Sequence, residues 1–105
     1  MLKIWGRSTS SNVQKAMWAV GELGLAYERI DIGGAFGKNK EPAYLAMNPN
    51  GLVPTLQDGD YLLWESNSIV RYLARIHGKG SLEPSESKAY GLANQWMDWQ
   101  LSVVG

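Results

Sequence analysis

Hydrophobic and polar positions repeat with different periods along the chain, and each period predicts a particular element. Residues 2–5 (LKIW) form a short apolar run that ends at Gly6, which is typical of a strand. The polar residues 7–12 follow and end in side chains that cap helices well. Apolar side chains then recur at i, i+3, i+4 and i+7, which predicts a helix with one buried face: Val13, Ala16, Met17 and Val20. Two glycines within residues 21–24 end this helix.

The next elements are a second strand, a short helix and a hairpin. Residues 27–32 alternate in the manner of a strand, and the length of the crossover favours a parallel pairing with the first strand. Residues 42–47 (PAYLAM) predict a short helix. In "TLQDGDYLLW", two apolar runs flank Asp58 and Gly59, and glycine supplies the positive φ that a tight turn needs. The third and fourth strands are therefore expected to be antiparallel.

A second amphipathic helix follows the hairpin, with Ser66 as the expected N-cap and Gly78 as the stop. Its expected buried face holds Ile69, Tyr72, Leu73 and Ile76. The order β-α-β-α-β-β-α is that of the thioredoxin-like fold, an α/β fold in which a four-stranded mixed sheet carries helices on both faces. We assign residues 1–80 to this domain.

Residues 81–105 predict a linker, which runs through Pro84, and a further amphipathic helix. One face of this helix carries Ala89, Ala93, Trp96 and Val103. Trp96 and Trp99 add large apolar surfaces that a single terminal helix cannot cover, and such surfaces usually mark an interface. We therefore expect another element or another copy of the chain to pack there.

Composition narrows the function classes. A chain of 105 residues has room for one domain of common size. Ten basic residues balance ten acidic ones, which argues against nucleic acid as a partner. No segment approaches the ~20 apolar residues of a membrane span or resembles a signal peptide, so we expect a cytoplasmic protein. The chain has no cysteine and one histidine, His77, which excludes thiol chemistry of its own and predicts no metal site.

Pro54 interrupts the apolar run in "NGLVPTL", and two interpretations are open. Proline lacks the N–H that a sheet ladder needs, so it is confined to strand starts, edges, bulges and turns. Pro54 either begins the short strand after it or marks a turn that contains a special peptide bond.

Three stretches, "SSNVQKAMW", "NPNGLVPTL" and "WESNSIVRYLA", resemble in order and spacing the N-terminal domain of cytosolic glutathione S-transferases. The resemblance is strongest to bacterial theta-like and beta-like members, which use serine rather than tyrosine. It covers residues 1 to about 80 and continues into the linker and the first helix of the family's all-helical C-terminal domain. The resemblance implies a transferase of detoxification that activates the thiol of its co-substrate glutathione for attack on an electrophile, without a metal.

The resemblance also implies how glutathione is held. A cis bond between Val53 and Pro54 would turn the Val53 N–H and C=O outward, where the extended tripeptide can pair with them like an added strand. Ser66 and the first N–H groups of its helix would bind the γ-glutamyl carboxylate, and Glu65 would reach the ammonium group. Asn67 is a further candidate. Ser66 also suits a purely structural capping role.

The glycine end of glutathione is less well provided for. Gly51 falls where several relatives place a side chain that contacts the glycine carboxylate, so this contact is expected to be missing. Lys38 or Lys40 could supply a cation instead, and the alternative is that both lysines are ordinary solvated surface residues.

The chemistry is expected at the start of the first helix. A glutathione thiol has a pKa near 8.5, and a hydroxyl that donates to the sulfur beside a helix N-terminus favours the thiolate. Ser11 lies four residues before Lys15, which matches the spacing S-x-x-x-(R/K) of the family, and is our choice of donor. Ser10 is an alternative, Asn12 or Thr9 could point at the sulfur instead, and either serine could be a helix cap.

The end of the chain departs from the family pattern. The C-terminal domain of the family holds most of the apolar electrophile and contributes to a homodimer, and nearly all of it is missing here. The sequence therefore suggests a truncated, proteolysed or split member that exposes Trp96, Met97 and Trp99 unless another copy covers them. The alternative to an enzyme is a non-catalytic module that binds glutathione or a protein. Glutaredoxin-type exchange is ruled out, because serine stands where a redox cysteine would.

Overall fold

The computed structural model describes residues 2–99, which form a four-stranded sheet and five helical segments. The strands are β1 (Leu2–Trp5), β2 (Tyr27–Ile30), β3 (Thr55–Asp58) and β4 (Tyr61–Trp64). The helices are α1 (Ser11–Glu22), α2 (Pro42–Met47), α3 (Ser66–His77) and α4 (Ser87–Trp99), with a 3-10 turn, η1, at Gly34–Phe36. The strand order is β2-β1-β3-β4, and only β1 and β2 are parallel, so the predicted mixed sheet and hairpin are confirmed.

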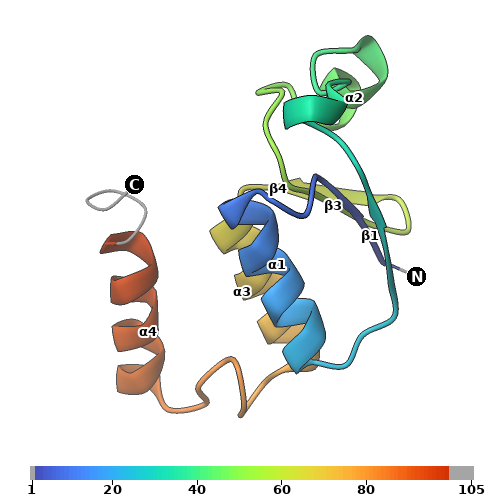
Figure 1. Cartoon of the computed structure of the whole chain (residues 1–105). Coiled ribbons are helices and arrows are strands. Elements are labelled where there is room, and N and C mark those ends of the chain that lie inside the picture. The colour runs from blue at the N-terminus through green and yellow to red at the C-terminus, as the bar shows by residue number, and fades with distance from the viewer. Residues whose placement is uncertain (1, 100–105) are drawn as a thin grey trace.

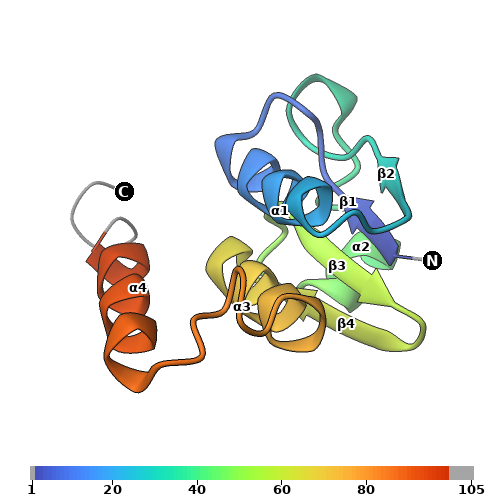
Figure 2. The ribbon, with the colours of Figure 1, turned by 90° about the horizontal axis from the view of Figure 1, so that it is seen from below.

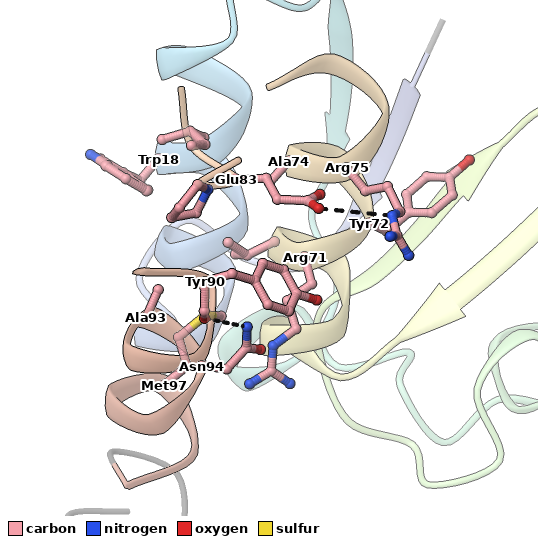
Figure 3. A pocket seen from close by; sticks show the side chains of 13 residues that line it. Trp18, Arg71, Tyr72, Ala74, Arg75, Glu83, Tyr90, Ala93, Asn94 and Met97 are labelled. Atoms are coloured by element: carbon pink, nitrogen blue, oxygen red, sulfur yellow. Dashed lines mark hydrogen bonds and ion pairs between the residues drawn. The ribbon is translucent and has the colours of Figure 1, made fainter. Parts of the chain in front are cut away.

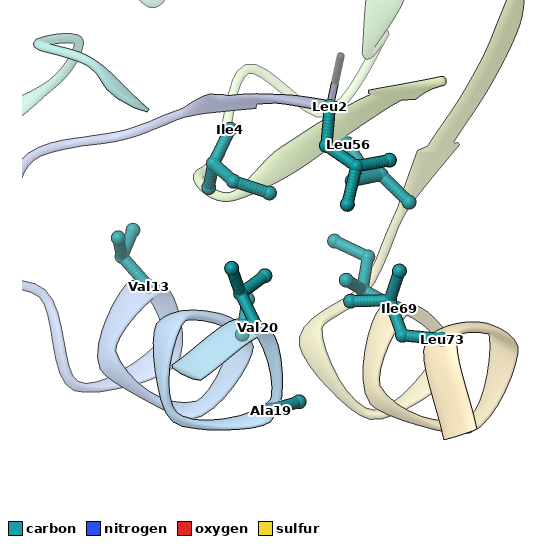
Figure 4. Close-up of a cluster of buried hydrophobic side chains, with 9 residues drawn as sticks. Leu2, Ile4, Val13, Ala19, Val20, Leu56, Ile69 and Leu73 are labelled. Atoms are coloured by element: carbon teal, nitrogen blue, oxygen red, sulfur yellow. The ribbon is translucent and has the colours of Figure 1, made fainter. Parts of the chain in front are cut away.

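The helices cover both faces of the sheet. Figures 1 and 2 show α1 and α3 side by side on one face and α2 on the other. The core lies between the sheet and the pair α1 and α3, where Leu2, Ile4 and Leu56 of the strands meet apolar side chains of the two helices (Figure 4). This packing holds the first turns of α1 and α3 at the same edge of the sheet as the loop before β3. The thioredoxin-like fold predicted from the sequence is confirmed.

Several details differ from the predicted pattern. The second strand ends at Ile30 rather than at residue 32. In α1, Ala19 is fully buried and Met17 only partly. In α3, Ile69 and Leu73 are buried, but Ile76 is 52% exposed because it lies on the last turn, beyond the core cluster. The sequence period identified both helices correctly but not where the neighbouring layer stops covering them.

Helix α4 stands apart from the sheet and its two covering helices (Figures 1 and 2). None of its described residues is buried, and Trp96 and Trp99 are 56% and 47% exposed, as predicted. Met97 was expected to be exposed but is half-buried, because it faces the cavity between α4 and α3. Val103, which was expected to share this helix face, lies outside the described residues. Within residues 2–99, the structure contains no helix that is both long and apolar enough to cross a membrane.

Candidate functional site

A pocket of about 250 Å³ opens where the loop before β3 meets the first turns of α1 and α3. The three segments are far apart in sequence and are brought together by the packing of both helices on the sheet. The pocket is lined by Asn12, Asn48, Asn50, Leu52, Val53, Pro54, Trp64, Glu65 and Ser66. Of the residues predicted from the sequence, Asn12, Val53, Pro54, Glu65 and Ser66 therefore share one site.

The loop before β3 offers an unpaired stretch of backbone to this pocket. The bond between Val53 and Pro54 is cis, as the resemblance implied, and the regular strand begins only at Thr55. Within residues 2–99, no other group forms a hydrogen bond with the N–H or the C=O of Val53. Backbone groups of this kind can pair with an added extended peptide.

Behind the loop, three buried polar side chains form a network that the sequence analysis did not identify. The Tyr44 hydroxyl lies 2.6 Å from the Leu52 carbonyl and 2.7 Å from Thr55 Oγ1. Asn48 Nδ2 donates to the same two oxygens at 3.0 and 3.2 Å. Burial raises the pKa of Tyr44 above its usual value. The network holds the loop before β3 in place through the Leu52 carbonyl. In the sequence, only the "NPN" run is a sign of it, since asparagine often bonds to the backbone of turns.

The first turn of α3 differs from its predicted form. Ser66 was expected to be the N-cap, but the N-cap is Glu65, whose Oε1 accepts the N–H of Asn67 at 3.1 Å. Glu65 has φ 81°, a positive value that is rare for a residue other than glycine and is often found at functional sites. Ser66 follows as the first helical residue, with its hydroxyl turned to Asn12 Oδ1 at 3.4 Å. Asn67 is buried behind this turn and does not line the pocket.

The start of α1 separates the two serines. Ser10 is the N-cap, and its Oγ accepts the N–H of Val13 at 3.4 Å. Ser11 is the first helical residue and is exposed, and its hydroxyl forms no hydrogen bond within the described part of the chain. Neither serine lines the pocket, whereas Asn12 does. The capping role weighed for both serines thus falls to Ser10.

Gly6, which follows β1, lies close to both the start of α1 and the loop before β3. A Cβ added at this glycine would lie 2.5 Å from Val13 Cγ2 and 3.2 Å from Val53 Cβ. Such short distances mean that no larger residue fits without movement of its neighbours. Gly6 therefore lets the start of α1 approach the backbone of Val53 closely.

The two candidate lysines lie in different surroundings. The Lys40 ammonium group occupies the space beside Gly51, only 2.7 Å from where a Cβ at that glycine would stand. Asn39 Nδ2 also donates to the Gly51 carbonyl at 2.8 Å. Lys38 is exposed, with φ 70°. Neither lysine lines the pocket, nor does Gly51. Of the two, only Lys40 thus brings a positive charge against the turn at Gly51. Across residues 2–99, no three His, Asp or Glu side chains gather in a way that could hold a metal ion.

Known proteins are similar to this chain in both sequence and fold. A family model described as the glutathione S-transferase N-terminal domain matches residues 1–75. Glutathione S-transferase GstB of Escherichia coli strain K12 is 48% identical over 101 residues, which cover 94% of this chain and 49% of that protein. The chain belongs to the glutathione S-transferase family. It spans about half the length of the relatives it matches.

Two solved structures with glutathione bound are similar to this chain. The theta class glutathione S-transferase of the citrus canker pathogen Xanthomonas axonopodis pv. citri has a TM-score of 0.94 and 55% identity, with 97% of this chain and 49% of that chain covered. A glutathione transferase homolog from Sulfitobacter has a TM-score of 0.88 and 28% identity, with 97% and 49% covered. The family and fold inferred from the sequence are thus confirmed.

Proposed function

We propose that the pocket between the Val53 loop and the first turns of α1 and α3 binds glutathione. The observation that carries this proposal is the unpaired N–H and C=O of Val53 at the pocket wall. An extended tripeptide can add to them as an antiparallel strand, which fixes its cysteine between the two helices. The glutathione bound in two relatives of the same fold supports the assignment.

The γ-glutamyl end is recognised at α3. The Ser66 hydroxyl and the free N–H at the start of this 12-residue helix are donors for the carboxylate, and the helix dipole favours negative charge there. The Glu65 carboxylate is placed to meet the ammonium group. Charge-assisted hydrogen bonds of this kind are about twice as strong as neutral ones. At the other end, Lys40 beside Gly51 is the cation for the glycine carboxylate, and Lys38 is the weaker candidate.

Ser11 is the donor to the glutathione sulfur. Its hydroxyl is exposed and forms no hydrogen bond within the described part of the chain, whereas Ser10 is 8% exposed and caps α1 by accepting the N–H of Val13. A hydrogen bond to the sulfur next to the positive end of α1 lowers the thiol pKa, and each pKa unit is worth about 1.4 kcal/mol in favour of the thiolate. Asn12, which lines the pocket, is the alternative donor.

The remaining assignments follow from the family. Residues 1–80 are the glutathione-binding domain, and residues 81–105 are the linker and first helix of a helical domain. The activated thiolate attacks a small apolar electrophile, which the helical domain holds in a full-length member. The protein is cytoplasmic, acts in detoxification and forms a homodimer. The alternative function is a non-catalytic thioredoxin-like module that binds glutathione or a protein without turnover.

Titration calorimetry with glutathione tests binding. Ser66→Ala should weaken binding about tenfold or more, because a hydrogen bond to a charged group is worth roughly 1.5–3 kcal/mol. Ser68→Ala is the matched control, since Ser68 lies on the same helix turn but outside the pocket. Equal weakening by both variants would contradict the site.

The role of Ser11 is tested separately. Ser11→Ala should raise the thiol pKa of bound glutathione, which the ultraviolet absorbance of the thiolate measures. Ser10→Ala should leave this pKa nearly unchanged in the folded fraction. The same pKa in both variants would rule out Ser11 and favour Asn12. Turnover of an aromatic electrophile would distinguish the enzyme from the binding module.

A further inference from the structure

Asn67 joins three helices directly behind the candidate site. It is 2% exposed, and its backbone N–H donates to Glu65 Oε1 at 3.1 Å. Its side-chain Nδ2 donates to the Met97 carbonyl of α4 at 3.0 Å, and its Oδ1 accepts from Lys15 Nζ of α1 at 3.3 Å. One buried side chain therefore connects the turn that carries Glu65 and Ser66 with both neighbouring helices.

This connection matters for helix α4 because its described residues pack only loosely on the rest of the fold. No described residue of α4 is buried. A cavity of about 350 Å³ separates α4 from α1 and α3, with Tyr90, Ala93 and Met97 on one side and Trp18 and Arg71 on the other (Figure 3). Two side-chain bonds between described residues cross from α3 to α4 near the C-terminal end of α4. They are the Asn67 bond and an exposed ion pair of 2.6 Å between Arg71 and Asp98.

We propose that Asn67 is a positioning residue that couples glutathione binding to the docking of α4, an inference that rests on the proposed function. The γ-glutamyl group, held by Glu65 and Ser66, restrains the first turn of α3. Asn67 belongs to this turn and bonds to the Glu65 carboxylate, so the same restraint holds its amide toward the Met97 carbonyl. A docked α4 in turn holds Asn67 and keeps Glu65 and Ser66 ready for ligand.

Such coupling is reciprocal. If docked α4 raises the affinity for glutathione by some factor, glutathione favours the docked state of α4 by the same factor. The factor expected from one buried hydrogen bond is roughly two- to tenfold. Weakly held elements of this kind open locally, so their amide hydrogen exchange reports their docking.

Hydrogen exchange of the unmodified 105-residue chain tests the proposal without any variant. Saturating glutathione should slow exchange in residues 94–99 by roughly two- to tenfold. γ-Glutamylcysteine, which keeps the γ-glutamyl group, should do the same, and cysteinylglycine should not. If calorimetry detects glutathione binding but exchange in α4 does not change, the coupling is refuted and the proposed function stands. If glutathione does not bind at all, the proposed function fails and the coupling fails with it.

Two variants then test Asn67 itself. Asn67→Ala should abolish the effect of glutathione on α4 exchange and weaken glutathione binding by the same two- to tenfold. Arg71→Ala, the matched control, also loosens α4 but leaves Asn67 in place, so glutathione should still slow exchange there. A glutathione effect that survives in both variants, or disappears in both, would overturn the role of Asn67. Far-UV circular dichroism confirms that each variant is folded.

Discussion

Removing the Tyr44 hydroxyl tests how the loop before β3 is held. Tyr44→Phe deletes two short contacts, to the Leu52 carbonyl and to Thr55 Oγ1, at a site that is 3% exposed. The Leu52 carbonyl keeps the Asn48 amide as a donor at 3.0 Å. The Tyr44 hydroxyl has one proton, which it donates to that carbonyl, so the buried Thr55 hydroxyl donates to Tyr44 and loses its acceptor in the variant. The expected loss therefore includes the cost of an unpaired buried O–H and is about 2–3 kcal/mol.

Urea denaturation measures this loss in the free energy of unfolding, and glutathione titration measures its effect on the site. In a thermal melt, a domain of this size should lose roughly 4–8 °C in Tm for each kcal/mol. Glutathione affinity should also fall, since the Val53 backbone is less well fixed. Tyr61→Phe is the matched control, because Tyr61 is 47% exposed and its hydroxyl forms no hydrogen bond with residues 2–99. Equal stability of the two variants would refute the account of the loop.

Three further predictions concern packing and pH. Gly6→Ala should lower the free energy of unfolding in urea by roughly 1–3 kcal/mol, because the new methyl group would lie 2.5 Å from Val13 Cγ2 of α1. Gly91→Ala, which has open space around it, should not destabilise the fold. The hydrogen bond to Asp58 raises the pKa of Tyr72 from 10.0 to about 12, so the stability it contributes is complete below pH 10 and lost as the pH rises through 12. An ultraviolet tyrosinate titration should lose its highest component in Tyr72→Phe. Two backbone N–H groups in the first turn of α4 lower the pKa of Glu86 below 4.5, so this cap is complete above pH 4.5 and lost as the pH falls through the lowered value. Hydrogen exchange of that turn should accelerate in acid, and in Glu86→Gln it should not depend on this titration.

Local sequence signals were sufficient for most of the fold. Helical periodicity located α1, the Asp58 and Gly59 pair located the hairpin, and residues 42–47 formed the short helix as predicted. These elements depend on spacing within a few residues of chain. The resemblance to the family added the cis bond before Pro54, for which sequence pattern alone left two interpretations open.

The site was predicted less completely, because it depends on contacts between distant residues. The N-cap of α3 was predicted one residue too late. Glu65, which has a positive φ, is the N-cap in place of Ser66. The bonds of Asn67 to Lys15 and Met97 join residues 52 and 30 positions apart, and no local pattern announces them. Asn67, which the sequence offered as a further candidate for ligand contact, lies behind the pocket and does not line it.

The measurement that tests the central claim most directly is the amide resonance of Val53 in a two-dimensional ¹⁵N NMR titration with glutathione. The Val53 and Ser66 amides should shift saturably at the same glutathione concentration, and hydrogen exchange at Val53 should slow because its N–H gains a partner. Saturable binding that leaves both amides unchanged, and instead shifts the Trp18 and Tyr90 amides around the cavity beside α4, would contradict that claim.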